Sequence, residues 1–152
     1  MIESICVEFE IPGPPIRFER PRWDSARRIT FNSTVYTDGK KRIKHYAKMN
    51  AVPEMVMHPC ELMAVFHMGM PAKSWPEKKK IAAMEGRSHF DKTPDVDNLI
   101  KAVMDGCNKI LWSDDAKVVR IDARKQYGFP ARTEVQVRWT PNEVLDGGKK
   151  NP

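Results

Sequence analysis

The segment from Pro94 to Asp115, PDVDNLIKAVMDGCNKILWSDD, constrains the fold more than any other part of the chain. At about 100° per residue, the apolar side chains of its first part fall in one arc of a helix, and the carboxylates, amides and a lysine fall in another. The apolar arc consists of Val96, Leu99, Ile100, Val103, Met104 and Cys107. Such a helix is stable when its apolar side packs against another layer. The sequence therefore predicts a half-buried helix from Asp95 or Val96 to about Asn108.

Alternating apolar and polar residues predict the strands that form the second layer. The four predicted strands are Ser4–Ile11, Glu61–Met70, Val118–Tyr127 and Thr133–Thr140. The short FPAR loop, Phe129–Arg132, lies between the last two, so we expect these two strands to pair as a hairpin.

Two further helices are predicted from the residues at their starts. Asp38 is a favourable cap for a helix that continues to about Met49. The SWPE stretch, Ser74–Glu77, has the pattern of a capping box with a proline in the first turn, and predicts a short helix to about Glu85.

The order of these elements predicts an α+β fold, with a small mixed β-sheet and helices packed mainly on one face. We expect one domain over residues 1–142 and a flexible tail over residues 143–152. No apolar run approaches the ~18 residues of a membrane-spanning helix. The N-terminal stretch also lacks the cationic and apolar regions of a signal peptide. We therefore expect a cytoplasmic location and no membrane partner.

The positive charge of the chain is concentrated in one segment, Pro14–Asn50. This segment holds ten Lys and Arg against three Asp and Glu, a net charge of +7, while the whole chain carries +6. Most of it lacks periodicity and reads as a long basic loop, with one short strand expected near Ile29–Tyr36. A clustered positive excess is typical of a surface that binds nucleic acid phosphates. The candidate DNA-binding residues are Arg17, Arg20, Arg22, Arg27, Arg28, Lys40, Lys41 and Lys44.

The segment Pro94–Asp115 is acidic although the chain is basic, and its carboxylates are five aspartates and no glutamate. One interpretation is structural, since aspartate caps helices and suits the first turn, and Asp97 can pair with Lys101 four residues later. The other interpretation is a metal site. Asp95 and Asp97 together exceed what one cap needs, and the pair Asp114–Asp115 follows shortly after the helix. Mg²⁺ prefers oxygen ligands, and converging carboxylates repel one another unless a cation lies between them.

The spacing of these residues resembles one family. Asp95-Val96-Asp97-Asn98-Leu99-Ile100-Lys101, then Asp105, then Asp114-Asp115-Ala116-Lys117-Val118, is similar to the D-x-D-N-x-x-K…D…D-D-x-Q-V signature of RusA-type Holliday junction resolvases. The stretches GPPIRFERPRW and VYTDGKKRIKHY resemble, more loosely, the basic entry of some members. The resemblance implies a mixed sheet with helices, a homodimer and a Mg²⁺-dependent endonuclease that cuts a four-way junction symmetrically.

Carried over residue by residue, the resemblance implies a metal site and a catalytic lysine. It makes Asp95, Asp97 and Asp115 the ligands of Mg²⁺, or of Mn²⁺ in its place, with Asp114 as an additional candidate. Lys101 takes the place of the catalytic lysine. Asp105 lies two turns along the helix and is expected to support the fold. The sequence departs from the family at Lys117, where the family usually has glutamine, and this bears on the preferred junction.

Together with the acidic segment, this resemblance implies a Mg²⁺-dependent endodeoxyribonuclease that resolves four-way junctions as a homodimer. A two-fold dimer supplies two identical sites for two symmetric cuts. We expect it to be nucleoid-associated and encoded by a bacterium or a phage. Two alternatives stay open: a nuclease of broader selection for branched DNA in phage replication, and a basic nucleic-acid-binding module without activity.

Aromatic residues divide into two groups. Trp112, Trp139 and Phe31 are expected in the core. Trp23 and Phe18 lie inside the basic loop, where both packing and contact with nucleic acid are open.

Overall fold

The computed structural model describes residues 3–51 and 54–141, and its centre is a four-stranded mixed sheet. The strands lie in the order β1 (Ile5–Pro12), β6 (Gly128–Trp139), β4 (Cys60–Gly69) and β5 (Val118–Gln126). β6 is antiparallel to both of its neighbours, and β4 and β5 are parallel. The predicted α+β fold with a small mixed sheet is confirmed. The predicted tail, residues 143–152, lies outside the described residues.

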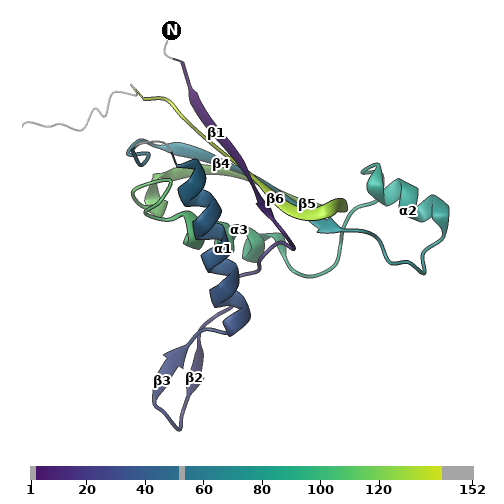
Figure 1. Cartoon of the computed structure of the whole chain (residues 1–152). Helices are drawn as coiled ribbons and strands as arrows, with labels where there is room; N and C mark the ends of the chain where they lie inside the picture. The colour runs from purple at the N-terminus through teal and green to yellow at the C-terminus, as the bar shows by residue number, and fades with distance from the viewer. Residues whose placement is uncertain (1–2, 52–53, 142–152) are drawn as a thin grey trace, which may run out of the picture.

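Two helices cover one face of this sheet, as predicted (Figure 1). They are α1 (Thr34–Asn50) and α3 (Val96–Cys107), which pack against each other. The short α2 (Glu77–Met84) lies to the side of the sheet, and a 3-10 turn, η1 (Asp115–Lys117), leads into β5. None of the helices in the described part of the chain is long and apolar enough to cross a membrane.

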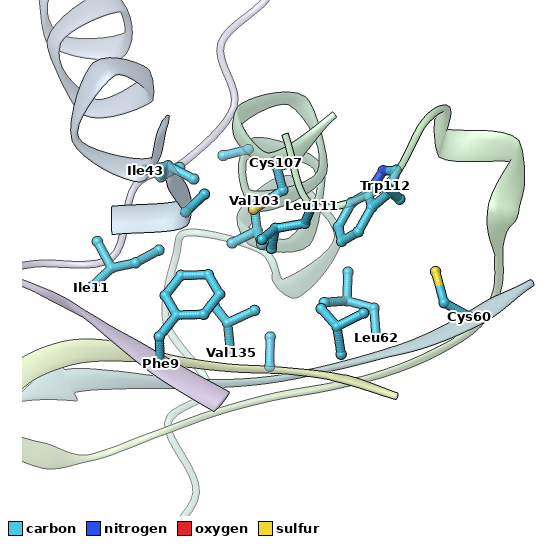
Figure 2. Close-up of a cluster of buried hydrophobic side chains, with 14 of the residues drawn as sticks. Phe9, Ile11, Ile43, Cys60, Leu62, Val103, Cys107, Leu111, Trp112 and Val135 are labelled. Atoms are coloured by element: carbon cyan, nitrogen blue, oxygen red, sulfur yellow. The ribbon is translucent and has the colours of Figure 1, made fainter. Parts of the chain in front are cut away.

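The core lies between the sheet and the two helices (Figure 2). Strand residues such as Phe9, Leu62 and Val135 meet Val103 and Leu111 from the helical layer. The predicted positions of Trp112 and Trp139 in the core are confirmed, because both side chains are buried.

α1 and α3 approach closely because a glycine lies at their contact. A Cβ atom on Gly106 of α3 would lie 2.3 Å from Cγ2 of Ile43 on α1. The two helices are also joined by a hydrogen bond, in which the Tyr36 hydroxyl of α1 donates to Oδ2 of Asp105 on α3 at 2.8 Å. Asp105 therefore supports the fold, as expected, and the two helices hold a fixed relation.

The expected hairpin of the last two strands is wrong. β5 and β6 are consecutive along the chain, but β4 lies between them in the sheet. The chain crosses the end of β4 at Gly128, where a Cβ atom would lie 2.4 Å from Nδ1 of His67. β6 accordingly begins at Gly128 and includes the FPAR stretch, rather than beginning at Thr133.

The starts of two helices also differ from the prediction. Ser33, not Asp38, caps α1, since its hydroxyl accepts a 3.1 Å bond from the backbone N–H of Tyr36. The helix therefore gains a first turn before Asp38. Pro76 is the N-cap residue of α2, and no side chain caps this helix, so Ser74 does not form the predicted capping box.

The basic loop contains a small hairpin that sequence patterning did not predict in full. β2 (Arg22–Asp24) pairs with β3 (Ile29–Phe31), and only β3 falls in the expected strand region. We call residues Ile16–Phe31 the arm. Figure 1 shows its hairpin extending beyond the end of α1, away from the four-stranded sheet. The core position expected for Phe31 is wrong, because on this extended hairpin its side chain is 42% exposed.

Candidate functional site

The candidate site begins at the first turn of α3, which presents two carboxylates to solvent. Asp95 is the N-cap residue by its backbone, yet its side chain makes no capping hydrogen bond. Asp97, in the first turn, accepts a 2.9 Å bond on Oδ1 from the backbone N–H of Asn98. Both residues are exposed. Capping therefore does not account for the Asp95 carboxylate, and Asp97 keeps one oxygen outside its local bond.

Two contacts from other elements hold this turn in place. On one side, Nζ of Lys125 on β5 donates a 3.0 Å hydrogen bond to the carbonyl oxygen of Pro94, the residue before Asp95. On the other side, the backbone N–H of Phe18 in the arm donates a 2.9 Å bond to the carbonyl oxygen of Asn98. The acidic turn is therefore tied both to the sheet and to the arm.

Lys101 lies one turn further along α3 and contacts the same part of the arm. Its Nζ atom is 3.9 Å from the centroid of the Phe18 ring, a cation–π contact. The Phe18 ring in turn packs edge-on against Tyr36, at 5.4 Å between centroids. The lysine is exposed, so its charge remains available to an anion while the ring restricts its position.

Asp114 and Asp115 lie at the turn before β5. Asp114 caps η1 by accepting a 2.8 Å bond from the backbone N–H of Ala116. Oδ1 of Asp115 accepts a 2.8 Å bond from the indole N–H of Trp112, whose ring is buried. Burial and, secondly, the Asp115 charge raise the pKa of the Cys107 thiol to about 12. Asp115 therefore lies near the last turn of α3, held in orientation by the core.

Within residues 3–51 and 54–141, no three His, Cys, Asp or Glu side chains are close enough to hold a metal ion together. The structure thus joins Asp95, Asp97 and Lys101 on one helix but does not gather Asp115 with them. Mg²⁺ is often held by one or two carboxylates, with waters and substrate phosphates as its other ligands. The exposed carboxylates of Asp95 and Asp97 are ligands of the type that such a site uses, and their metal-binding role stays a prediction.

The predicted DNA-binding residues occupy two neighbouring elements. The five arginines, Arg17, Arg20, Arg22, Arg27 and Arg28, lie on the arm and are exposed. Lys40, Lys41 and Lys44 follow on α1, with Lys41 exposed and the other two half-buried. Phe18, in the same stretch of chain as these cations, contacts α3 at Asn98. The cationic stretch therefore begins beside the acidic turn.

Sequence patterning did not predict how two residues position the site, although Phe18 was already a candidate for packing or for contact with nucleic acid. Lys125 lies on the face of β5 that is turned toward the helices, together with Ile121 and Ala123. A lysine at an inward-facing strand position was the one feature of the sequence that could have indicated a positioning role. Phe18 had no such signal, because its contacts to Asn98 and Lys101 join distant parts of the chain.

Comparison with known proteins places this α+β domain among the endodeoxyribonucleases. The family model described as Endodeoxyribonuclease RusA matches residues 12–138. The chain is also 30% identical over 141 residues to the uncharacterized protein YqaN of Bacillus subtilis (strain 168), covering 88% of this chain and 96% of YqaN. The chain belongs to the RusA endodeoxyribonuclease family, and the resemblance found at the acidic segment is confirmed.

Proposed function

We propose that this protein is a Mg²⁺-dependent endonuclease that resolves four-way DNA junctions. The main support is that Asp95, Asp97 and Lys101 lie at exposed positions of α3, beside the root of an arginine-rich arm. Membership of the RusA endodeoxyribonuclease family supports the same chemistry. An acidic turn next to a cationic surface suits phosphodiester hydrolysis, which needs both phosphate binding and a nucleophilic water.

Each group has a distinct role in this proposal. Asp95 and Asp97 would hold the Mg²⁺ or Mn²⁺ ion. Asp115, with Asp114 as an additional candidate, is proposed as a further ligand on the family resemblance alone, because the described structure does not bring it into one cluster with the other two. When bound, such an ion lowers the pKa of a water and offsets charge on the reacting phosphate. The Lys101 ammonium stabilises negative charge on the phosphate oxygens. The arginines of the arm bind flanking phosphates and hold the DNA backbone against α3.

We further propose that the protein acts as a homodimer. Resolving a junction requires two cuts in matching strands, and a two-fold dimer places two identical sites in symmetric positions. One branched DNA molecule then occupies both sites at once. The Ile16–Phe31 arm of each protomer binds the DNA beside the site of the same protomer.

Two alternative functions predict a different set of cleaved DNA substrates. A nuclease of broader selection would cut forks and flaps as fast as four-way junctions. A binding module without activity would bind DNA and leave every substrate intact, with the aspartates serving only to cap and balance charge.

One assay separates these functions. End-labelled four-way junction, fork and duplex of shared sequence are incubated with the protein, with Mg²⁺ and with EDTA. We expect paired symmetric cuts in the junction only when Mg²⁺ is present. Equal cutting of the fork would favour the broader nuclease, and binding without any product in Mg²⁺ or Mn²⁺ would contradict the proposal.

A further inference from the structure

The arm keeps large apolar side chains in solvent on both faces of its hairpin. Trp23 is 62% exposed and Ile29 46% exposed. In the register of β2 and β3, Trp23 pairs with Thr30, whereas Arg22 pairs with Phe31 and Asp24 with Ile29. Trp23 therefore lies on the face opposite Ile29 and Phe31. An isolated two-stranded hairpin is only marginally stable in water, so a partner that covers these side chains would stabilise the arm.

The charge of the arm indicates what kind of partner this is. Between Ile16 and Phe31 there are five arginines against Glu19 and Asp24. Oδ1 of Asp24 is engaged in the turn, where it accepts bonds of 2.9 and 3.1 Å from the backbone N–H groups of Ala26 and Arg27. The turn thus places Arg27 and Arg28 at the tip of the arm. A partner that is anionic and also presents flat apolar surfaces is a polynucleotide, since its phosphates meet the arginines and its bases meet the indole.

The geometry further selects among nucleic acid structures. Within a duplex the flat faces of the bases are stacked on one another, so an exposed indole gains a stacking partner only where bases are unpaired or at a branch. The arm extends away from the sheet (Figure 1), while its root is fixed to α3 by the Phe18 N–H bond to Asn98. A base that stacks on Trp23 is therefore held by an arm whose root contacts the acidic turn.

We propose that Trp23 stacks on an unpaired DNA base at a branch point, and that this contact makes the protein prefer branched DNA over duplex. The inference rests on the proposed function only in taking DNA as the polynucleotide. Stacking of a base on an aromatic side chain accounts for about 5- to 150-fold in affinity.

The test compares binding by Trp23→Ala, Trp23→Leu and Trp23→Phe in EDTA, so that no cleavage is needed. The probes are a four-way junction with 2-aminopurine at the branch and a duplex of the same sequence. We expect the alanine and leucine variants to bind the junction about 5- to 150-fold more weakly and the duplex within about twofold of wild type. The phenylalanine variant should keep most of the affinity, because it keeps an aromatic face. The fluorescence change of 2-aminopurine on binding should be lost with alanine and leucine only.

Phe129→Ala provides the matched control, because Phe129 is a 69% exposed aromatic residue at the start of β6, outside the arm. Unchanged junction preference in Trp23→Leu would overturn the inference. So would a loss of the dimer in DNA-free Trp23→Ala, which would make a second copy of the chain the occupant of this face. A protein that cuts no DNA in Mg²⁺ yet loses junction binding with Trp23→Ala would instead reject the proposed function and leave this inference standing.

Discussion

At the scale of single residues, the side chains of the candidate site differ in how firmly their neighbours hold them in position. Lys101 is exposed but restrained by the Phe18 ring, 3.9 Å from its Nζ atom. Asp95 makes no capping bond, while Asp115 is oriented by the Trp112 indole. The types and spacing of these residues were readable in the sequence, because carboxylates and a lysine at helical spacing form a pattern. The restraint on Lys101 was not readable, because Phe18 is distant along the chain.

Replacing Lys101 by alanine tests its proposed role at the phosphate. We expect Lys101→Ala to slow junction cleavage by about 10²–10³-fold, the effect of losing one charge-stabilising donor. Junction affinity in EDTA should change little, because the arginines supply most phosphate contacts. Single-turnover cleavage and direct binding measure the two quantities separately. Lys101→Arg, which keeps the charge, should recover part of the rate, whereas a parallel fall in affinity and rate would make Lys101 a binding residue.

At the scale of elements, local patterns located most strands and helices but not their pairing. The alternation of Val118–Tyr127 and Thr133–Thr140 predicted two strands correctly, and their short connection predicted a hairpin. In the sheet, β4 lies between them, which is a long-range pairing that local spacing does not encode. The arm shows a related limit, because a hairpin of two three-residue strands is too short for periodicity to reveal.

The arm's role in phosphate binding can be measured by its salt dependence. Replacing Arg20 and Arg22 by alanine should weaken junction binding, because each neutralised phosphate releases counterions. The slope of log affinity against log salt should fall by about 0.9 for each phosphate that the variant no longer neutralises. The matched control is the double change Arg120→Ala and Arg124→Ala on β5, which removes the same charge from the sheet face turned away from the helices. Equal slopes for wild type and the arm variant would exclude Arg20 and Arg22 from the DNA surface.

The bond between Tyr36 and Asp105 predicts a pH-dependent link between α1 and α3. Burial and the hydrogen bond to Asp105 raise the pKa of Tyr36 above its ordinary value of 10.0. Below about pH 10 the hydroxyl is protonated in both the folded and unfolded chain, so its contribution to stability is fully present. Above that pH the unfolded chain releases the proton first, so the free energy of unfolding falls.

Tyr36→Phe should therefore lower the free energy of unfolding by about 1–2 kcal/mol at pH 8. Between about pH 10 and 11, wild type should lose stability more steeply than the variant, so that the difference between them narrows. Urea unfolding at each pH gives both values. Parallel curves for the two proteins across this range would show that the hydroxyl titrates alike in both states.

At the scale of the whole molecule, the two faces of the sheet differ in charge. The face turned away from the helices carries ion pairs, such as those in which Glu61 is the shared partner of Arg138 and Arg120. A hollow of about 360 Å³ on the sheet has Glu8, Glu10 and Glu134 in its lining. The excess of positive charge lies instead on the arm and α1, with ten Lys and Arg against three Asp and Glu over Pro14–Asn50. DNA is therefore expected to approach from the arm, on the side of the acidic turn.

Junction binding and cleavage by Asp97→Asn test most directly whether the acidic turn of α3 is the active site. Asparagine keeps the size and the helix-start preference of aspartate, so folding should survive. We expect this variant to bind the four-way junction in EDTA as tightly as wild type or more tightly, since it removes a negative charge that faces phosphates. In Mg²⁺ it should give no product, while Asp122→Asn, the same charge change at an exposed position on β5, should cut at the wild-type rate. Cleavage by Asp97→Asn at the wild-type rate in Mg²⁺ would show that the acidic turn of α3 does not carry out the reaction.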